Sequence, residues 1–418
     1  MFFNFSALEI IAWVWYNYFI LYFHTKGDAL MSQVAVVACE DYGNENVSSA
    51  LKAVLDETTG LDWVTPGMKI AIKANLVSYL PPDRAATTHP ALLCELTRLL
   101  VERGATVVVG DSPGGLYNHA FVGRVYSVTG MRDIERFGGR LNYDFGQSEA
   151  SFPEAKQARS FSYTSYLDDA DAIINFCKLK SHGMMSLSCA VKNMFGVIPG
   201  TMKPEYHYRF PSHADFADML VDLNEYFKPK LRLCLCDAVI GMEGNGPTAG
   251  TPRTIGAILA SSSPYLLDLT AARLVGLTRD NVPTLEAAYL RGLAPAEIEG
   301  VDVSEGYDKF IITDYQNITT HSTLEFGQLL GGGVFGRLVS RLAGVFLRSK
   351  PKVEKKGCIG CGVCKNICPP KAIKIKNGVA VIDRHSCIRC FCCQEFCPKG
   401  AMKVKRTLVA RMFVRNAK

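Results

Sequence analysis

Nine of the fifteen cysteines lie within residues 358 to 397, where one spacing is repeated twice. Each copy reads C-x2-C-x2-C-x3-C-P, first from Cys358 to Pro369 and then from Cys387 to Pro398. Three thiols at this spacing can wrap around one metal cluster, and the proline after the fourth cysteine keeps the next helix out of the site. Because thiolates in this pattern ligate iron–sulfur clusters, the segment predicts two 4Fe–4S clusters that carry single electrons.

The pattern resembles that of bacterial two-cluster ferredoxins, in which the fourth cysteine of each run ligates the other cluster. We therefore assign one cluster to Cys358, Cys361, Cys364 and Cys397, and the other to Cys387, Cys390, Cys393 and Cys368. The residues between the runs, 372 to 383, alternate around Asn377 and Gly378 as a hairpin would. Structural zinc fits poorly, because four-cysteine zinc sites usually pair two separated C-x2-C knuckles. Disulfides fit poorly because exposed clusters belong in a reducing cytosol.

The other cysteines are interpreted as packing residues. Cys392 falls outside the ligand spacing, and we expect a partly buried neighbour of the cluster, with a spare ligand or a redox thiol as alternatives. The six cysteines of the preceding region lie mostly in apolar runs and are expected in the core.

The charge is divided unevenly along the 418 residues, a length that predicts at least two domains. Residues 1–336 hold 26 Lys and Arg against 37 Asp and Glu, whereas residues 337–418 hold 20 against 3. The C-terminal net charge of +17 is typical of a segment that meets nucleic acid, anionic lipid or an acidic protein, and cluster thiolates would cancel part of it. We expect an acidic electron-transfer protein of the ferredoxin or flavodoxin type as partner, and no nucleic acid.

The N-terminal residues 1–30 form an apolar extension. Between Ile10 and Phe23, Asn17 is the single polar residue, but this run is shorter than the roughly twenty residues that span a membrane. It has neither the basic start nor the cleavage site of a secretory signal. We interpret Met31 as the translation start, with an N-terminal membrane anchor as the alternative, and expect a cytoplasmic protein.

Short apolar strands and amphipathic helices alternate between residues 31 and 325. The expected strands are Val34 to Cys39, Lys69 to Lys73, Thr106 to Val109, Ala172 to Phe176, Leu231 to Cys236, Ala257 to Ala260 and Phe310 to Thr313. Helices are expected from Ala91 to Arg103 and around Phe216 to Phe227. This alternation predicts an α/β domain with a mostly parallel sheet and helices on both faces, followed by a small α+β two-cluster domain.

Polar residues follow four of these strands, at the carboxyl edge where α/β sheets bind ligands. Asp111 and Ser112 follow one strand, and Asn75 and His89 follow another. The other two strand ends contribute Lys178, Lys180, His182, Lys192, Asn193, Asp237, Glu243 and Asn245. We expect a shared crevice, although each segment alone could be an ordinary loop.

Five stretches resemble, in order, the family known as domain of unknown function 362, many members of which carry a C-terminal two-cluster ferredoxin. They are THP, GDSPGG, INFCKLKSHGMMSLSCAVKNMFG, DAVIGMEGNGP and LDLTAARLVGL. The resemblance covers roughly residues 32 to 300 and implies the architecture but no activity. We therefore divide the chain into 1–30, the α/β domain 31–325, a linker 326–355, the cluster domain 356–403 and a basic tail 404–418.

Two signals in the linker are discounted. Residues 331–336, GGGVFG, match the dinucleotide pattern G-x-G-x-x-G, but no convincing strand precedes them, so a glycine joint is expected. The stretch RLVSRLAGVFLRSK predicts a basic amphipathic helix, which we expect to pack on its own domain, with membrane contact as the alternative.

These features together predict an iron–sulfur reductase. The clusters would pass electrons to a small anionic substrate in the crevice, held by Lys178, Lys180 and Lys192, with Asp111, Ser112 and Asn193 as further binding residues. Asp237, Glu243 or His182 would move protons. The alternatives are a non-catalytic carrier or adaptor that docks a partner enzyme, and a ligase or transferase with structural clusters.

Overall fold

The computed structural model describes residues 32–318 and 350–405. The expectations for the N-terminal run, the GGGVFG segment, most of the basic helix and most of the tail lie outside these residues. Within them, no helix is long and apolar enough to cross a membrane.

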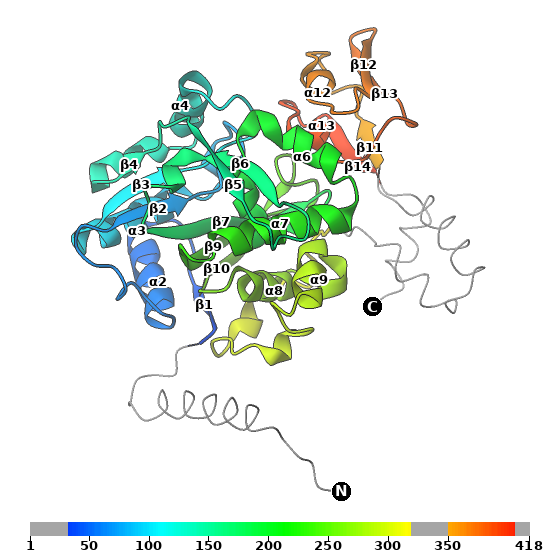
Figure 1. Ribbon diagram of the computed structural model, residues 1–418. Coiled ribbons are helices and arrows are strands. Elements are labelled where there is room, and N and C mark those ends of the chain that lie inside the picture. The colour runs from blue at the N-terminus through cyan, green and yellow to red at the C-terminus, as the bar shows by residue number, and fades with distance from the viewer. Residues whose placement is uncertain (1–31, 319–349, 406–418) are drawn as a thin grey trace, which may run out of the picture.

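The centre of the large domain is an eight-stranded sheet in the order β1-β10-β9-β7-β2-β3-β4, with β8 paired to β7 (Figure 1). The strands are β1 (Val34–Ala38), β2 (Lys69–Lys73), β3 (Thr106–Gly110), β4 (Arg140–Leu141), β7 (Ala172–His182), β8 (Ser186–Ser188), β9 (Leu231–Glu243) and β10 (Thr251–Ser261). The five strands from β9 to β4 pair in parallel, whereas β10 and β8 run antiparallel to their neighbours. The predicted mostly parallel sheet is therefore confirmed.

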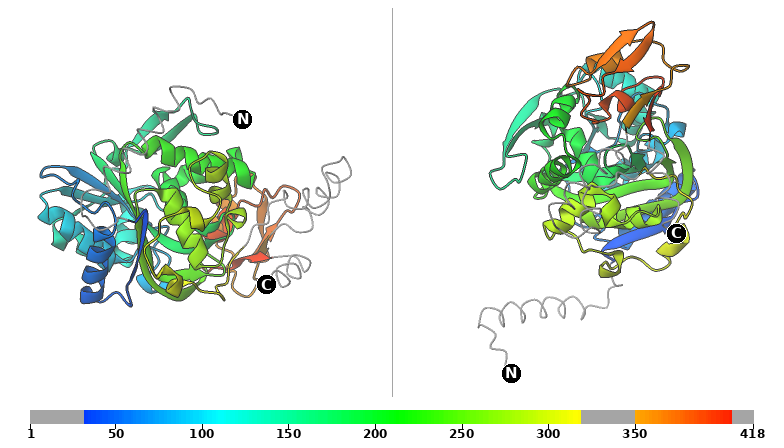
Figure 2. Two further views of the ribbon diagram at one scale, coloured as in Figure 1. Left: turned by 90° about the horizontal axis from the view of Figure 1, so that it is seen from below. Right: turned by 90° about the vertical axis from the view of Figure 1, so that its right-hand side faces the viewer.

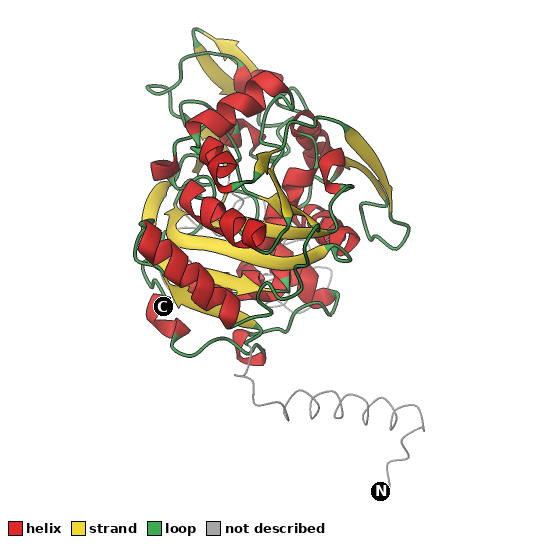
Figure 3. Cartoon of the chain, turned by 90° about the vertical axis from the view of Figure 1, so that its left-hand side faces the viewer, coloured by secondary structure: helices red, strands yellow, loops and turns green. Residues whose placement is uncertain are grey.

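Helices cover both faces of this sheet, because its strands are apolar on both sides and need two cores. One core packs beneath α2 (Asn44–Asp56), α3 (Pro90–Glu102) and α4 (His119–Val128). The other packs beneath α5 (Ala190–Asn193), α6 (Lys203–Arg209), α7 (His213–Phe227), α8 (Pro264–Leu274) and α9 (Pro283–Leu290). Figure 3 shows helices lying across the strands.

Shorter elements complete the large domain. A separate hairpin pairs β5 (Gln147–Ser151) with β6 (Ser160–Thr164). Single turns of 3-10 helix occur at Pro82–Arg84, Met131–Phe137, Ser165–Leu167, Met194–Val197, Gly200–Met202, Arg279–Asn281, Ile298–Gly300 and Tyr307–Phe310. All six cysteines of this domain are buried, and the sulfur atoms of Cys177, Cys189 and Cys236 lie within 4.8 Å of one another.

The cluster domain is small and lies at one end of the molecule (Figures 1 and 2). Its elements are β11 (Lys350–Val353), α12 (Val363–Asn366), β12 (Ile373–Lys376), β13 (Val379–Ile382), α13 (Cys392–Glu395) and β14 (Met402–Lys405). Strands β12 and β13 form the hairpin around Asn377 and Gly378, both of which have positive φ. Strand β11 pairs with β14, so the domain includes residues from 350 onwards.

Three strands are longer than expected, among them β10, which begins at Thr251 rather than Ala257, and one expected strand is absent. Strand β7 continues six residues beyond Phe176 to His182, and β9 continues from Cys236 to Glu243. The added polar residues remain in these strands because their side chains find buried partners. Residues 310–313 form no strand, because Phe310 ends a 3-10 turn and packs into the core.

A buried carboxylate, Asp222 of α7, joins the connection between β5 and β6 to the core. It accepts the backbone N–H groups of Lys156, Gln157 and Ala158 at 2.7–3.1 Å and pairs with Arg291 at 2.8 Å. The connection therefore depends on one side chain for its backbone hydrogen bonds.

We expect Asp222→Ala to lower the free energy of unfolding by about 3–5 kcal/mol, because it leaves a cation and three N–H groups without their acceptor. Guanidinium unfolding measures this. The matched control is Asp133→Ala, which breaks an exposed pair with Arg136 and should cost less than about 1 kcal/mol. Equal losses in both variants would contradict the role of Asp222.

Candidate functional site

Two small voids in the cluster domain separate the cysteines into the two expected sets. One void is lined by Cys358, Cys361, Cys364 and Cys397, and the other by Cys368, Cys387, Cys390 and Cys393. Backbone N–H groups of Ala380, Ala372 and Ala401 point to ligand sulfurs at 3.2–3.4 Å. Such hydrogen bonds tune the reduction potential of thiolate-ligated clusters. The residues present therefore fit iron–sulfur clusters.

Cys392 lies beside these ligands and is almost fully buried. It lines the void formed by Cys390 and Cys393, at the start of α13. Cys392 is therefore a buried neighbour of the predicted ligands Cys390 and Cys393.

The polar strand ends of the large domain surround a cavity of about 60 Å³, here called the inner cavity. Seven residues named from the sequence line it, namely Asn75, Asp111, Ser112, Lys180, His182, Lys192 and Asn193. Glu395 and Phe396 of the cluster domain close it. The volume suffices for about four waters or one small oxyanion.

Strand geometry explains how β7 presents its polar residues. Lys178, Lys180 and His182 alternate with Leu179 and Ser181, so their side chains lie on one face of the strand. Lys180 Nζ donates to Asn75 Oδ1 at 2.8 Å and to the Ala86 carbonyl at 2.7 Å. An amide chain continues from there, because Asn75 donates to Asn193 at 2.9 Å.

His182 connects the two domains. Its Nδ1 accepts the N–H groups of Met184 and Met185, each at 3.1 Å, so Nε2 is the nitrogen that carries the proton. Nε2 lies 2.8 Å from Glu395 Oε1. Both ring nitrogens therefore have partners, and the expected role of His182 as an acid or base stays a prediction.

Lys192 is the least satisfied cation of the cavity. Its ammonium faces the rings of Phe195 and Phe216 at 4.8 and 5.9 Å, and no acceptor among the described residues lies within hydrogen-bond distance. Nearby, the buried hydroxyl oxygen of Ser112 also lacks a partner among these residues. Two unpaired polar groups thus line one small cavity, which favours an anion as occupant.

Burial changes the protonation of these groups. It lowers the pKa of Lys180 to about 7, aided by the nearby charge of Lys192, and that of Lys203 to about 7. Burial also lowers the pKa values of Lys192 and His182. Lys180 can therefore gain or lose a proton near neutral pH.

Three predicted site residues lie elsewhere. Lys178 pairs with Asp237 at 2.8 Å and both are fully buried, while Asp237 also accepts the N–H of His89 and the hydroxyl of Tyr42. Glu243 accepts the N–H of Gln316 at 3.0 Å. Both carboxylates thus have partners outside the inner cavity, and neither lines it.

Three residues at this site were not predicted from the sequence. Lys73, on β2, pairs with Asp111 at 2.7 Å. Lys203 donates to the carbonyls of Ser112 and Ile198. Lys73 ends an apolar strand beside the named Asn75, which is a usable signal, whereas nothing in the sequence connects Glu395 with a residue 213 positions away.

Comparisons with known proteins agree with the architecture of an α/β domain followed by a cluster domain. Residues 70–273 match the family described as a domain of unknown function, DUF362, and residues 350–398 match a 4Fe-4S dicluster domain. A thylakoid-associated protein of Synechocystis sp. is 29% identical over 278 residues, which cover 65% of this chain and 83% of that protein.

Two solved structures show weaker likeness. A Thermotoga maritima protein has a TM-score of 0.33 at 14% identity, with 51% of this chain and 54% of that one covered. The lactate racemase apoprotein from Thermoanaerobacterium thermosaccharolyticum has a TM-score of 0.38 at 11% identity, with 58% and 57% covered. The chain thus spans little more than half the length of these two.

We expect Lys178→Met to lower the free energy of unfolding by about 3–5 kcal/mol, because it leaves buried Asp237 without its cation. Chemical denaturation measures the loss. Lys228→Met, which breaks an exposed pair with Glu225, should change stability by less than about 1 kcal/mol. If Lys178→Met instead kept full stability, the pair would not be structural.

Proposed function

Because the chain joins a DUF362 domain to a 4Fe-4S dicluster domain, we propose that it is an iron–sulfur oxidoreductase. In this proposal two 4Fe–4S clusters relay low-potential electrons to a small anionic substrate in the inner cavity. One observation carries the proposal: α13 and the residues after it belong to both sites. Cys393 and Cys397 line the two cluster voids, while Glu395 and Phe396, between them, close the inner cavity.

The charge of the inner cavity supports an anionic substrate. Lys180, Lys192 and Lys203 line it, whereas the lining carboxylates are Asp111, already paired with Lys73, and Glu395, which contacts His182. Positive charge is thus in excess, and buried ammonium groups are costly without an acceptor. A carboxylate or another small oxyanion would satisfy Lys192 and accept the hydroxyl of Ser112.

The residues of the cavity can also handle protons. When bound, the clusters supply single electrons at low potential. Lys180, with a pKa of about 7, can donate a proton to a reduced substrate and regain it near neutral pH. Asn75 holds its ammonium in place, and Phe396 and Glu395 keep bulk water away from the reacting group.

Electrons would enter from an acidic donor protein of the ferredoxin or flavodoxin type. The net charge of +17 in residues 337–418 would steer such a donor. Cys361 is exposed beside Ile359, which is 61% exposed, so this edge supplies an entry point. A reducing compartment such as the cytoplasm suits exposed clusters.

The same exposed edge favours a second candidate function, a non-catalytic carrier that docks a partner enzyme. Native mass spectrometry of anaerobically purified protein separates the two. A stoichiometric small molecule would support the reductase, and a stable complex with a second enzyme would support the carrier.

The cluster assignment predicts about eight iron atoms and eight acid-labile sulfides per chain. Cys364→Ser should remove one cluster and therefore about half of the iron, because it deletes a ligand. Cys392→Ser, the matched control one residue from a ligand, should keep both clusters. Metal analysis after anaerobic purification measures this, and zinc in place of iron would refute the assignment.

We expect Lys192→Met to weaken the binding of a small oxyanion probe, bicarbonate, at least tenfold, because a charge-assisted hydrogen bond contributes about 1.5–3 kcal/mol. Titration calorimetry measures the affinity. The substitution breaks no hydrogen bond within the described residues, so iron content and stability should remain. Lys156→Met, on a half-exposed lysine paired with Asp218, is the control and should bind normally.

Binding should also depend on pH. Lys180 is protonated below its pKa of about 7 and neutral above it, so affinity for the anion should fall as the pH rises from 6 to 8. In Lys180→Met the affinity should be lower and its dependence on pH weaker, with the remaining slope due to Lys203, whose pKa is also about 7. An unchanged slope in that variant would assign the titration to another group.

A further inference from the structure

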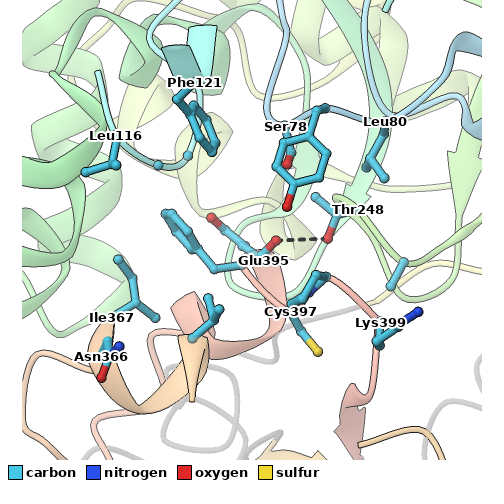
Figure 4. A pocket seen from close by; sticks show the side chains of 18 of the residues that line it. Ser78, Leu80, Leu116, Phe121, Thr248, Asn366, Ile367, Glu395, Cys397 and Lys399 are labelled. Atoms are coloured by element: carbon cyan, nitrogen blue, oxygen red, sulfur yellow. Dashed lines mark hydrogen bonds between the residues drawn. The ribbon is translucent and has the colours of Figure 1, made fainter. Parts of the chain in front are cut away.

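A second, larger cavity lies between the two domains. It measures about 790 Å³ and is here called the outer cavity (Figure 4). The large domain contributes Tyr79, Arg84, Leu116 and Phe121, among others, and the cluster domain contributes the segment 395–400 with parts of α12. This volume lies in the range of sites that bury a cofactor-sized molecule, whereas the inner cavity is more than tenfold smaller.

The outer cavity lies directly against a predicted cluster ligand. Cys397 lines both this cavity and the void that also contains Cys358, Cys361 and Cys364. Figure 4 shows Cys397 on the side opposite Phe121. A molecule bound here would be separated from that cluster by little more than a thiolate.

The outer cavity also adjoins the inner one. Gly114, Glu395 and Phe396 line both. The ring of Phe396 packs on Gly114, where a Cβ atom would approach it to 3.1 Å. This ring and the two residues beside it therefore form the partition between the cavities.

The walls suit a flat aromatic ring. Tyr79 and Phe121 meet edge to face at 5.7 Å, and Arg124 supports the ring of Tyr79 from 4.6 Å. Leu116 and Val363 line the same space although 57% and 37% of their surfaces are exposed. Large apolar side chains left exposed around one concavity indicate a binding site.

The polar part of the lining suits a negative charge. Arg84, Lys399 and Lys403 contribute cationic groups, and Asn366, Ser78 and Thr201 contribute hydrogen-bonding groups. Among the described residues, Glu395 is the one carboxylate in this lining, and it faces His182. Phosphate recognition by Arg and Lys at such a rim is common.

We propose that the outer cavity binds a planar aromatic redox molecule that carries an anionic group, of the flavin mononucleotide class. The inference rests on the proposed function, because it takes its electrons from the clusters. It supplies a step that the clusters alone lack, since they deliver electrons singly whereas reduction of a closed-shell substrate requires a pair. The bound ring would accept two electrons in succession, with two protons from solvent. It would pass both electrons across the Phe396 partition to the substrate, release its two protons to solvent and return to its oxidised form, while the substrate takes up two protons in the inner cavity, one from Lys180 and one from solvent.

The test is calorimetric titration of the full, cluster-loaded chain with flavin mononucleotide under anaerobic conditions. We expect one site per chain. Leu116→Trp should weaken binding at least tenfold, because the larger ring takes up space in the cavity that the bound ring would occupy. Leu290→Trp is the matched control, on a leucine that is 66% exposed and outside both cavities, and it should bind normally. Arg84→Met should weaken flavin mononucleotide more than riboflavin, which lacks the phosphate.

The outcomes separate this inference from the proposed function. No saturable binding of flavin mononucleotide, or equal binding by the Leu116→Trp variant and the native chain, would overturn the outer site, whatever the bicarbonate titration shows. Retained flavin binding by Lys192→Met would support a site separate from the inner cavity. If bicarbonate binds nowhere while flavin mononucleotide binds as expected, the proposed substrate site falls and the outer site stands.

Discussion

Gln394 holds the two domains in one arrangement on which both cavities depend. Its buried amide nitrogen donates to the carbonyls of Asn245 and Gly246 at 2.8 and 2.7 Å. Asn245 in turn exchanges hydrogen bonds with β14, through the Met402 carbonyl and the Val404 N–H. The loop after β9 therefore binds two separate parts of the cluster domain, and this contact places Glu395 over β7. Buried carbonyls that lost this donor would have no water to replace it.

The buried lysines of the large domain fall into two groups, those paired with a carboxylate and those without a carboxylate partner among the described residues. Lys73 and Lys178 each have a carboxylate partner at 2.7–2.8 Å, so their charge is compensated inside the protein. Lys180 donates hydrogen bonds to neutral oxygens. The ammonium of Lys192 contacts only aromatic rings among the described residues. A folded domain tolerates such a cost where a ligand later relieves it. Lys180, Lys192 and Lys203, which have no carboxylate partner among the described residues, line the inner cavity, so charge compensation distinguishes them from Lys73 and Lys178.

The sequence predicted what local chemistry or sheet geometry determines. Cluster ligation imposes its own spacing on the cysteines, and parallel strands bring their ends to one edge, so Asp111, Lys180 and Asn193 were correctly expected together. The sequence could not show which strand-end residues line the inner cavity and which pair with one another away from it. Asp237 and Glu243 were therefore grouped with the cavity residues, although they do not line the cavity. The extension of β7 to His182 depends on partners distant in the chain, Asn75 and Glu395 among them. Such partners leave no periodic signal.

The position of α13 connects the cluster voids with both cavities, so electron transfer and ligand binding would not be independent under the proposed function. Its four residues, Cys392–Glu395, begin beside one cluster void, and the chain reaches Cys397 in the other void two residues after the helix ends. Between these points, Glu395 and Phe396 line both cavities. A ligand that displaced these two side chains would also change the surroundings of two cluster ligands. Since coupling between binding events is reciprocal, a change in cluster charge must then alter ligand affinity by the same free energy. Under the proposed function, reduction of the clusters and occupation of the cavities would therefore be linked through one short segment.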